Sequence, residues 1–312
     1  MTAGEHVRVL LGPQTPVTNV GAAVAGLPEG PLAVISAGWQ EAEGDLDELA
    51  EHVGRPLEDL RLYERVEEVT GRDSSLAAAI RERQARLVDL QCLYRLRLKQ
   101  LAIAARRVLE AEGDAELLAA EQRHAIAQLR ALDRHHLHSS ETIWGKFLET
   151  YSADSHPLLA RHASELDGIL RRSAAAVITG GNVAVLINRM RLVGLGGMLN
   201  GRHIVAWSAG AMALTSRIVL FHERSPEGRR DAEVLGAGCG IIPGYVFLPD
   251  AKRRLRTRDR LRVGLMSRRF APDVCVALEN GTELILDDAG IRDYEGARQL
   301  NHHGRLGRIR AR

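Results

Sequence analysis

Several features that would assign a chain to a functional class are scarce in this sequence. Only three cysteines occur among 312 residues, Cys92, Cys239 and Cys275, and none belongs to a CxxC pair. This scarcity argues against a disulfide framework or a cysteine-based zinc site, and the apolar neighbours of all three predict buried, reduced thiols. The formal net charge is only +2, so the overall charge points to no polyanionic partner.

Long apolar runs are also missing. No stretch approaches the roughly 18 to 20 apolar residues of a membrane span, and the first residues do not form a basic leader followed by an apolar run. We therefore expect a cytoplasmic protein without a membrane partner. The composition itself is globular, with 45% hydrophobic and 26% charged residues, and predicts one large domain or one domain with an insertion.

Short apolar runs alternate with helix-compatible stretches in both halves of the chain. They occupy residues 7–11, 32–36, 174–179, 203–207, 217–221, 274–278 and 283–287. Buried parallel strands have this compact character and alternate with helices that cover both faces of their sheet. The sequence therefore predicts an α/β fold with three layers and a mostly parallel central sheet.

The middle of the chain, residues 74–172, differs in kind. It is rich in Ala, Leu, Arg, Glu and Gln and nearly free of Gly and Pro. Apolar residues recur at helical spacing from Leu76 to Val108 and from Leu118 to Leu132, on either side of a turn at 112–116. We expect an antiparallel helical hairpin, then shorter helices around Trp144 and at 158–170. This helical insertion would interrupt an α/β domain made of residues 1–73 and 173–312.

The apolar stripe of such long helices must pack against something, because isolated helices are marginally stable. We expect the insertion to form a homo-oligomer contact, to bind a protein partner or to act as a lid; purely internal packing is the alternative. A histidine cluster, His135, His136 and His138, lies near the end of the second helix. Neighbouring helical residues point in different directions and nothing completes a tetrahedral ligand set, so we predict no metal site.

Ser208 lies where a strand-like run meets a helix-like run. Residues 203–214 read HIVAWSAGAMAL. A serine on a strand-to-helix corner projects its hydroxyl above the carboxyl edge of the sheet, beside unpaired N–H groups of the helix start. Ala206 replaces the first glycine of G-x-S-x-G, so this segment alone fits a nucleophile elbow and a structural turn equally well.

A glycine pair ends another predicted strand. Residues 174–190 read AAAVITGGNVAVLINRM. Gly180 and Gly181 would expose backbone N–H groups at the carboxyl end of that strand, which an oxyanion hole requires. An ordinary strand-to-helix turn is the alternative interpretation.

Four distinctive segments occur in a fixed order along the chain. They are ITGGN (178–182), WSAGAMAL (207–214), LGAGCGIIPG (235–244) and LENGTELIL (278–286), while GPQ (12–14) and ISAGWQE (35–41) fit less specifically. Together they resemble the landmarks of the peptidase E and cyanophycinase family of serine peptidases. The resemblance covers roughly residues 1–70 and 174–290. It implies a class I glutamine amidotransferase-like, flavodoxin-like fold. We expect no cofactor.

The resemblance also implies roles for individual residues. Ser208 corresponds to the nucleophile of the SAGA motif, and the N–H groups of Gly181 and Ala209 would form the oxyanion hole. Gly180 and Asn182 would bind the substrate, and Glu279 would be the supporting acid. The family has a histidine shortly after its Pro-Gly turn, but residues 245–261 contain none, and the corresponding position is near Asp250.

A serine hydroxyl needs a base that takes its proton, and a carboxylate is a much poorer base than an imidazole. Loss of one triad member typically costs about 10⁴ to 10⁶ in rate. His222 could supply the imidazole from the end of a predicted strand, although a loop histidine is the plainer interpretation. His302 and His303 belong to a basic tail that we expect to be solvated. Asp250 could instead anchor a cationic ligand group.

A dense run of arginines covers residues 252–269. It predicts a solvated helix face or a contact with an anionic ligand or protein; without interleaved aromatic residues it does not favour nucleic acid.

Two functions follow from the whole sequence. The first is a peptidase E-type serine hydrolase with weakened or lost peptidase activity, acting on a small peptide or an amino-acid-derived ligand. The second is a non-catalytic scaffold that binds a ligand or a protein partner. Glutamine amidotransfer is disfavoured, because it needs a cysteine where Ser208 stands.

Overall fold

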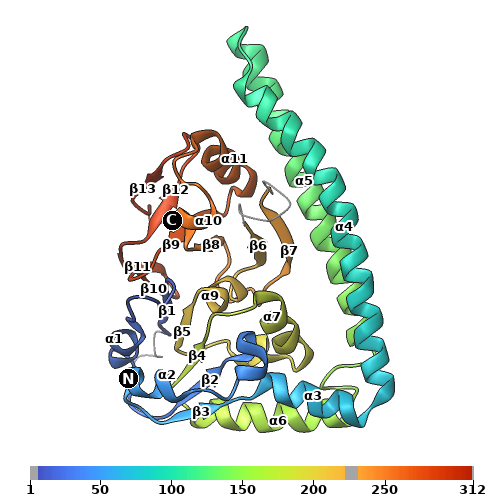
Figure 1. The fold of residues 1–312 in the computed structure, drawn as a ribbon, viewed down its shortest axis with the longest axis vertical. Coiled ribbons are helices and arrows are strands. Elements are labelled where there is room, and N and C mark those ends of the chain that lie inside the picture. Colours follow the sequence, from blue (N-terminus) through green and yellow to red (C-terminus); the bar gives the residue numbers. More distant parts are fainter. Residues whose placement is uncertain (1–5, 222–230, 311–312) are drawn as a thin grey trace.

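The computed structural model describes residues 6–221 and 231–310, and it confirms the α/β fold with a mostly parallel central sheet, flanking helices and a large helical segment (Figure 1). The seven strands of that sheet follow the spatial order β11-β10-β1-β5-β4-β2-β3. Strands β1, β5, β4, β2 and β3 are parallel, whereas β10 and β11 add an antiparallel edge. Their bounds are β1 Arg8–Leu11, β2 Leu32–Ile35, β3 Leu57–Asp59, β4 Ala175–Ile178, β5 Ile204–Trp207, β10 Glu283–Asp287 and β11 Gly290–Glu295.

Helices cover both faces of the sheet, because successive strand residues point to opposite sides. Val9 and Leu11 pack with α1 (Val20–Ala25) and α2 (Asp47–Val53) on one face. Leu10, between them, belongs to the larger core on the other face. The helices contributing to that second core include α6 (Pro157–Arg172), α7 (Val183–Leu192), α8 (Leu195–Met198) and α9 (Ala209–Ala213).

Two runs expected in the central sheet form strands elsewhere. Strand β6 (Arg217–Leu220) pairs antiparallel with β7 (Glu233–Ala237) in a separate ribbon. Strand β9 (Val274–Leu278) lies parallel to β8 (Tyr245–Pro249), because α10 (Ala251–Arg254) and α11 (Arg260–Phe270) carry the chain back to the start of a neighbouring strand. Two short strands, β12 (Arg298–Leu300) and β13 (Leu306–Gly307), complete this second sheet in the order β13-β12-β9-β8.

The large helical segment is a hairpin of two long helices. Helix α4 (Ser74–Glu110) has 37 residues and α5 (Ala115–Leu148) has 34, so each is about 50 to 55 Å long. Asp73 and Asp114 accept N–H bonds from the first turns of these helices, which satisfies donors that a helix start leaves open. The hairpin runs along one side of the body and extends past it (Figure 1).

The hairpin differs in one detail from expectation. Trp144 does not lie in a separate short helix. It lies within α5, because no proline interrupts the helical pattern before Leu148 and the single Gly145 does not end the helix. Helix α3 (Leu62–Arg72) leads into the hairpin and α6 follows it. The division into residues 1–73 and 173–312 with an inserted 74–172 stays a prediction. Within the described ranges, no helix is both long enough and apolar enough to cross a bilayer.

The cysteines only partly match their predicted burial. Cys275 is buried and Cys239 is half-buried, and burial raises the pKa of both thiols to about 12. Cys92 is exposed. The prediction was wrong for Cys92, because its apolar neighbours Leu93 and Leu96 also lie on the solvent side of α4.

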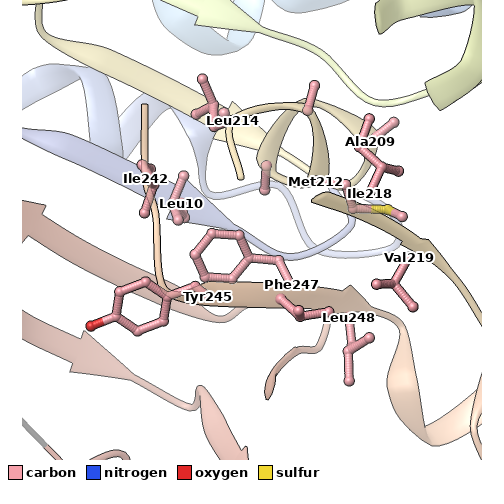
Figure 2. Close-up of a cluster of buried hydrophobic side chains, with 14 of the residues drawn as sticks. Leu10, Ala209, Met212, Leu214, Ile218, Val219, Ile242, Tyr245, Phe247 and Leu248 are labelled. Atoms are coloured by element: carbon pink, nitrogen blue, oxygen red, sulfur yellow. The ribbon is translucent and has the colours of Figure 1, made fainter. Parts of the chain in front are cut away.

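A dense apolar cluster supports the short helix α9. Figure 2 shows Ala209 and Met212 of α9, with Phe247 and Leu248 of β8 on the opposite side of the cluster. Met212 is 5% exposed and Phe247 is 1% exposed. Since interiors pack at crystal-like density, this contact holds the start of α9 in a defined position. The residue directly before α9 is Ser208.

Candidate active site

Several chain segments meet at the edge of the central sheet where its parallel strands end. Trp207 of β5 pairs with Leu11 of β1, and Ala206 pairs with Ile178 of β4. The neighbouring strand β2 ends at Ile35, which pairs with Ile178. Because carboxyl ends of parallel strands meet at the same edge, Ser208, Gly180 and the turn after β2 lie together, as open α/β sheets place their ligand sites. The antiparallel β10 brings the segment before Glu283 to this edge as well, through its pairing with Leu11.

Ser208 adopts a strained backbone conformation. Its φ is 49° and its ψ is −115°, between the end of β5 and the first residue of α9. A side chain rarely tolerates this region, and such strain concentrates at functional corners. The hydroxyl makes no capping bond to α9 in the described structure, although serine is a favoured N-cap. The Ser208 hydroxyl is therefore available to a ligand.

Glycines let the neighbouring backbone approach this corner. A Cβ atom at Gly180 would lie 3.2 Å from the Cβ of Ser208, and one at Gly210 would lie 2.3 Å from the carbonyl oxygen of Ile178. Gly181 has a φ of 102°, and a Cβ there would lie 2.3 Å from the carbonyl oxygen of Gly38. Larger residues at Gly181 and Gly210 would push the turns apart.

In the described part of the chain, the two N–H groups expected to form the oxyanion hole have no backbone acceptor. Among the described residues, neither the Gly181 N–H nor the Ala209 N–H donates to a backbone oxygen, whereas the next one, at Asn182, donates to Gly38 O at 2.7 Å. Ala209 is the first residue of α9, where helices leave N–H donors open. Both groups are thus free to stabilise a developing negative charge.

A cavity of about 300 Å³ opens onto Ser208. Gly180 and Gly181 line it beside the serine, and the indole rings of Trp39 and Trp207 belong to its wall. The loop that begins at Pro13 closes another side. Such a volume is at the lower end of the usual range for small-molecule sites.

Asn182, the other expected substrate-binding residue, has a structural bond. Its side-chain oxygen accepts the N–H groups of Ala184 and Val185 and caps α7. It is not among the residues lining the Ser208 cavity. Its role toward a substrate stays a prediction.

Asp250 and Glu279 lie beside each other, at the ends of the parallel strands β8 and β9. Pro249 pairs with Leu278, and the Asp250 N–H donates to Leu278 O at 2.9 Å. The Asp250 carboxylate forms ion pairs with two arginines of its own helix, Arg253 and Arg254. The cation that Asp250 holds therefore comes from the chain itself.

Glu279 is half-buried and accepts the N–H of Lys252 at 2.9 Å. Burial raises the pKa of Glu279, this hydrogen bond opposes the rise, and the nearby Asp250 carboxylate adds to it. The Glu279 backbone carbonyl packs against Gly12, directly after β1. Glu279 thus lies at the same edge of the central sheet as Ser208. No hydrogen bond joins its carboxylate to Ser208 in the described parts of the chain.

The sequence interpretation missed a histidine in the Ser208 cavity. His52, on α2, lines this cavity together with Glu48 and Asp45. The Nε2 atom of His52 lies 3.7 Å from a carboxylate oxygen of Glu48, one helical turn earlier. A Glu-x-x-x-His spacing soon after a predicted strand end was the available signal, but the same spacing is common on solvated helix faces.

Of the other histidines considered, neither His302 nor His303 lines the Ser208 cavity. His222 lies outside the described residues. His302 and His303 are exposed, as expected, but they lie in the turn between β12 and β13, where the carbonyl of His302 accepts a bond from Arg268 of α11. Burial lowers the pKa of His302. Across residues 6–221 and 231–310, no group of three or more His, Cys, Asp or Glu side chains could hold a metal ion.

The arginine-rich segment combines exposed cations, as expected, with a buried apolar side. Arg269 is 4% exposed, and α11 also buries Val263, Met266 and Phe270. Only part of the segment, including Lys252 and Arg253, is exposed.

No protein-family model and no curated protein sequence matches the chain. Among solved structures, a peptidase from an acI-B1 actinobacterium has a TM-score of 0.44 and 11% identity, with 96% of this chain and 91% of that chain covered. A proposed peptidase E protein from Listeria monocytogenes EGD-e has a TM-score of 0.44 and 9% identity, with 96% and 100% covered. Likenesses at this level say nothing about the activity of this chain.

Proposed function

We propose that the protein is a serine hydrolase of the peptidase E type, with Ser208 as the nucleophile. One observation carries the proposal: a serine in a strained corner opens into a cavity beside Gly180 and Gly181. The hydroxyl is not used in capping, and the N–H groups of Gly181 and Ala209 have no backbone acceptor in the described structure. The substrate is a small peptide or another amino-acid-derived acyl compound.

His52 supplies the proton acceptor in this proposal, in place of the histidine absent after residue 244. It is the imidazole that lines the Ser208 cavity among the described residues, and Glu48 lies at its Nε2 atom. Ser208 Oγ forms a bond to the acyl carbon while its proton passes to Nδ1 of His52. The imidazolium then returns that proton to the leaving group as the bond between this group and the acyl carbon breaks. Water, whose proton passes to His52, attacks the acyl carbon, and His52 returns the proton to Ser208 Oγ as the ester bond breaks.

This arrangement predicts slow catalysis. The Glu48 side chain is 90% exposed and the His52 side chain 43% exposed, so water weakens the orienting interaction. A catalytic acid that supports an imidazole in an efficient triad is buried. Asp250 and Glu279, the positions suggested by the family resemblance, instead bond to the segment 252–254.

A fluorophosphonate probe tests this function. We expect slow covalent labelling of the wild-type chain, detected by intact-mass spectrometry, and none for Ser208→Ala. His52→Gln should slow labelling by about 10² to 10⁴, the usual contribution of a general base. The matched control is His138→Gln, because His138 is an exposed histidine on α5 that lines none of the described cavities.

The outcomes separate the two parts of the proposal. Labelling that needs Ser208 but is equal in His52→Gln and His138→Gln would retain the hydrolase and exclude His52. Wild-type protein that is never labelled at Ser208 would exclude the hydrolase.

The second candidate function is a non-catalytic scaffold. It is favoured by the exposed apolar side chains of the hairpin, Val88, Leu93, Leu96 and Leu117, which are 49 to 66% exposed. In that case a homo-oligomer or a protein partner would contact the hairpin, and the Ser208 cavity would bind its ligand without cleavage. Absence of labelling together with a concentration-dependent molar mass in sedimentation would favour this alternative.

A further inference from the structure

Arg83 is a buried cation, and two of its three guanidinium nitrogens have no hydrogen-bond acceptor among the described residues. It lies in the first part of α4. This helix begins next to α3, at the end of the hairpin that joins the body (Figure 1). The residue is 5% exposed, and within the described chain its buried Nε and Nη1 atoms have no hydrogen-bond partner. Arginine is rarely this buried unless it is paired. An unpaired guanidinium in such a position indicates a missing anionic partner.

Aromatic rings hold the guanidinium but cannot satisfy its N–H groups. The Cζ atom of Arg83 lies 3.8 Å from the ring centre of Trp144 and 4.4 Å from that of Phe147. Stacking on a ring face attracts the positive charge. The N–H donors lie in the plane of the guanidinium and need acceptors at its edge. The rings therefore position the group without neutralising it.

The two arginines that repel Arg83, Arg189 and Arg191, already pair with acids. Arg191 pairs with Glu141 at 2.6 Å, and Arg189 pairs with Glu67 at 2.7 Å. Burial first, and then repulsion from these two arginines, lower the pKa of Arg83 to about 9. Arg83 therefore stays charged at neutral pH.

A cavity of about 170 Å³ opens beside this arginine, between α4 and α5. Its charged lining consists of three cations, Arg83, Arg86 and Lys146, and one carboxylate, Glu82. Thr150 and Tyr151 add two hydroxyl-bearing side chains. The volume equals that of about five or six water molecules, enough for a phosphate or carboxylate group with a few further atoms. No lining residue is shared with the Ser208 cavity.

We propose that this cavity binds a small oxyanion, whose oxygen atoms accept the N–H groups of Arg83. Arg86 and Lys146 add positive charge at the entrance, since both are exposed, and a planar guanidinium suits two-oxygen recognition of phosphate or carboxylate. The site is independent of the chemistry at Ser208. It gives the base of the hairpin a ligand-binding role.

The test measures binding of inorganic phosphate and of succinate to the full chain by titration calorimetry, at constant ionic strength set with chloride. Saturable binding of one of them is expected, and the stronger of the two identifies the headgroup as phosphate or carboxylate. Arg83→Met should weaken this binding at least tenfold. Arg81→Met is the matched control and should leave it unchanged, because Arg81 is exposed on the same helix and does not line the cavity.

A second variant guards against a folding defect in Arg83→Met. Lys146→Gln changes an exposed residue of the cavity and should weaken binding by about threefold to tenfold, the usual size of one charge-assisted contact. Saturable binding that is equal in the wild type, Arg83→Met and Lys146→Gln would overturn the proposal. So would the absence of saturable binding of both anions to the wild-type chain.

Discussion

Two buried arginines, one at each end of the contact between the hairpin and the body, have opposite surroundings. Arg269 of α11 is 4% exposed and Arg83 of α4 is 5% exposed. Arg269 donates to both carboxylate oxygens of Asp133, at 2.6 and 2.7 Å, and to the hydroxyl of Tyr94 at 2.8 Å. Arg83 has no such partner among the described residues. The two arginines are therefore equally buried but differ in their partners. Arg269 has a structural counter-ion, whereas Arg83 has none among the described residues.

The two environments shift the pKa values of Arg269 and Arg83 in opposite directions. Burial alone would lower the pKa of Arg269, but the Asp133 carboxylate outweighs it and raises the pKa. For Arg83, burial and two neighbouring arginines both lower the pKa. The Asp133 network joins α4, α5 and α11, and Tyr94 also accepts the N–H of Val234 in β7. It attaches the hairpin to the body, whereas the Arg83 end remains open to a ligand.

The largest expected effect comes from breaking the satisfied network. Asp133→Asn should lower the free energy of unfolding by about 3 to 5 kcal/mol, because it leaves Arg269 buried without a counter-charge. Urea denaturation followed by circular dichroism measures this change. Asp89→Asn is the control, since Asp89 is exposed on α4 and should change stability by less than about 0.5 kcal/mol. Equal, small effects of both variants would show that Asp133 does not compensate Arg269.

A smaller effect is expected from removing one hydroxyl of the same network. Tyr94→Phe deletes a group that donates to Asp133 at 2.8 Å and accepts from Val234 N–H at 3.1 Å. The buried donor left behind should cost about 1 to 3 kcal/mol. Tyr294→Phe, at a half-buried edge position, serves as the comparison in the same urea experiment. A Tyr94→Phe chain as stable as Tyr294→Phe would mean that the network is held by the ion pair alone.

The contrast between these arginines could not be read from the sequence. Both lie in segments with several arginines, and only the packing of α5 against α11 brings Asp133 to one of them. The sheet edge was more predictable. Compact apolar runs that end in glycine or serine correspond to β4 and β5, so the sequence predicts both Ser208 and Gly181 at the carboxyl ends of strands.

Three features escaped sequence interpretation for physical reasons. Strands β6 and β9 have the same apolar pattern as the central strands, because periodicity reports burial and not the identity of the neighbouring strand. His52 shares its spacing from Glu48 with many surface helices, so only the cavity distinguishes it. Cys92 faces solvent because a helix longer than its packing surface exposes apolar residues as well as polar ones.

The smallest expected effect concerns Arg83 itself and depends on pH. At pH 7 without a bound anion, Arg83→Met should change the free energy of unfolding by no more than about 1 kcal/mol, because relief of an unpaired buried charge offsets the lost ring contacts. The charged groups around Arg83 are Glu82 and Arg86 on α4, Glu141 and Lys146 on α5, Arg189 and Arg191 on α7 and Glu67 on α3.

The sign of the pH effect follows from the lowered pKa. Because the folded chain releases the Arg83 proton near pH 9 and the unfolded chain keeps it until about 12.5, the unfolded state binds more protons above pH 9. Wild-type stability should therefore rise relative to Arg83→Met as the pH increases from 8 to about 10.5, in parallel urea titrations of the two chains. A difference that stays constant over this range would show that Arg83 keeps its proton and that its pKa is not lowered in the folded chain.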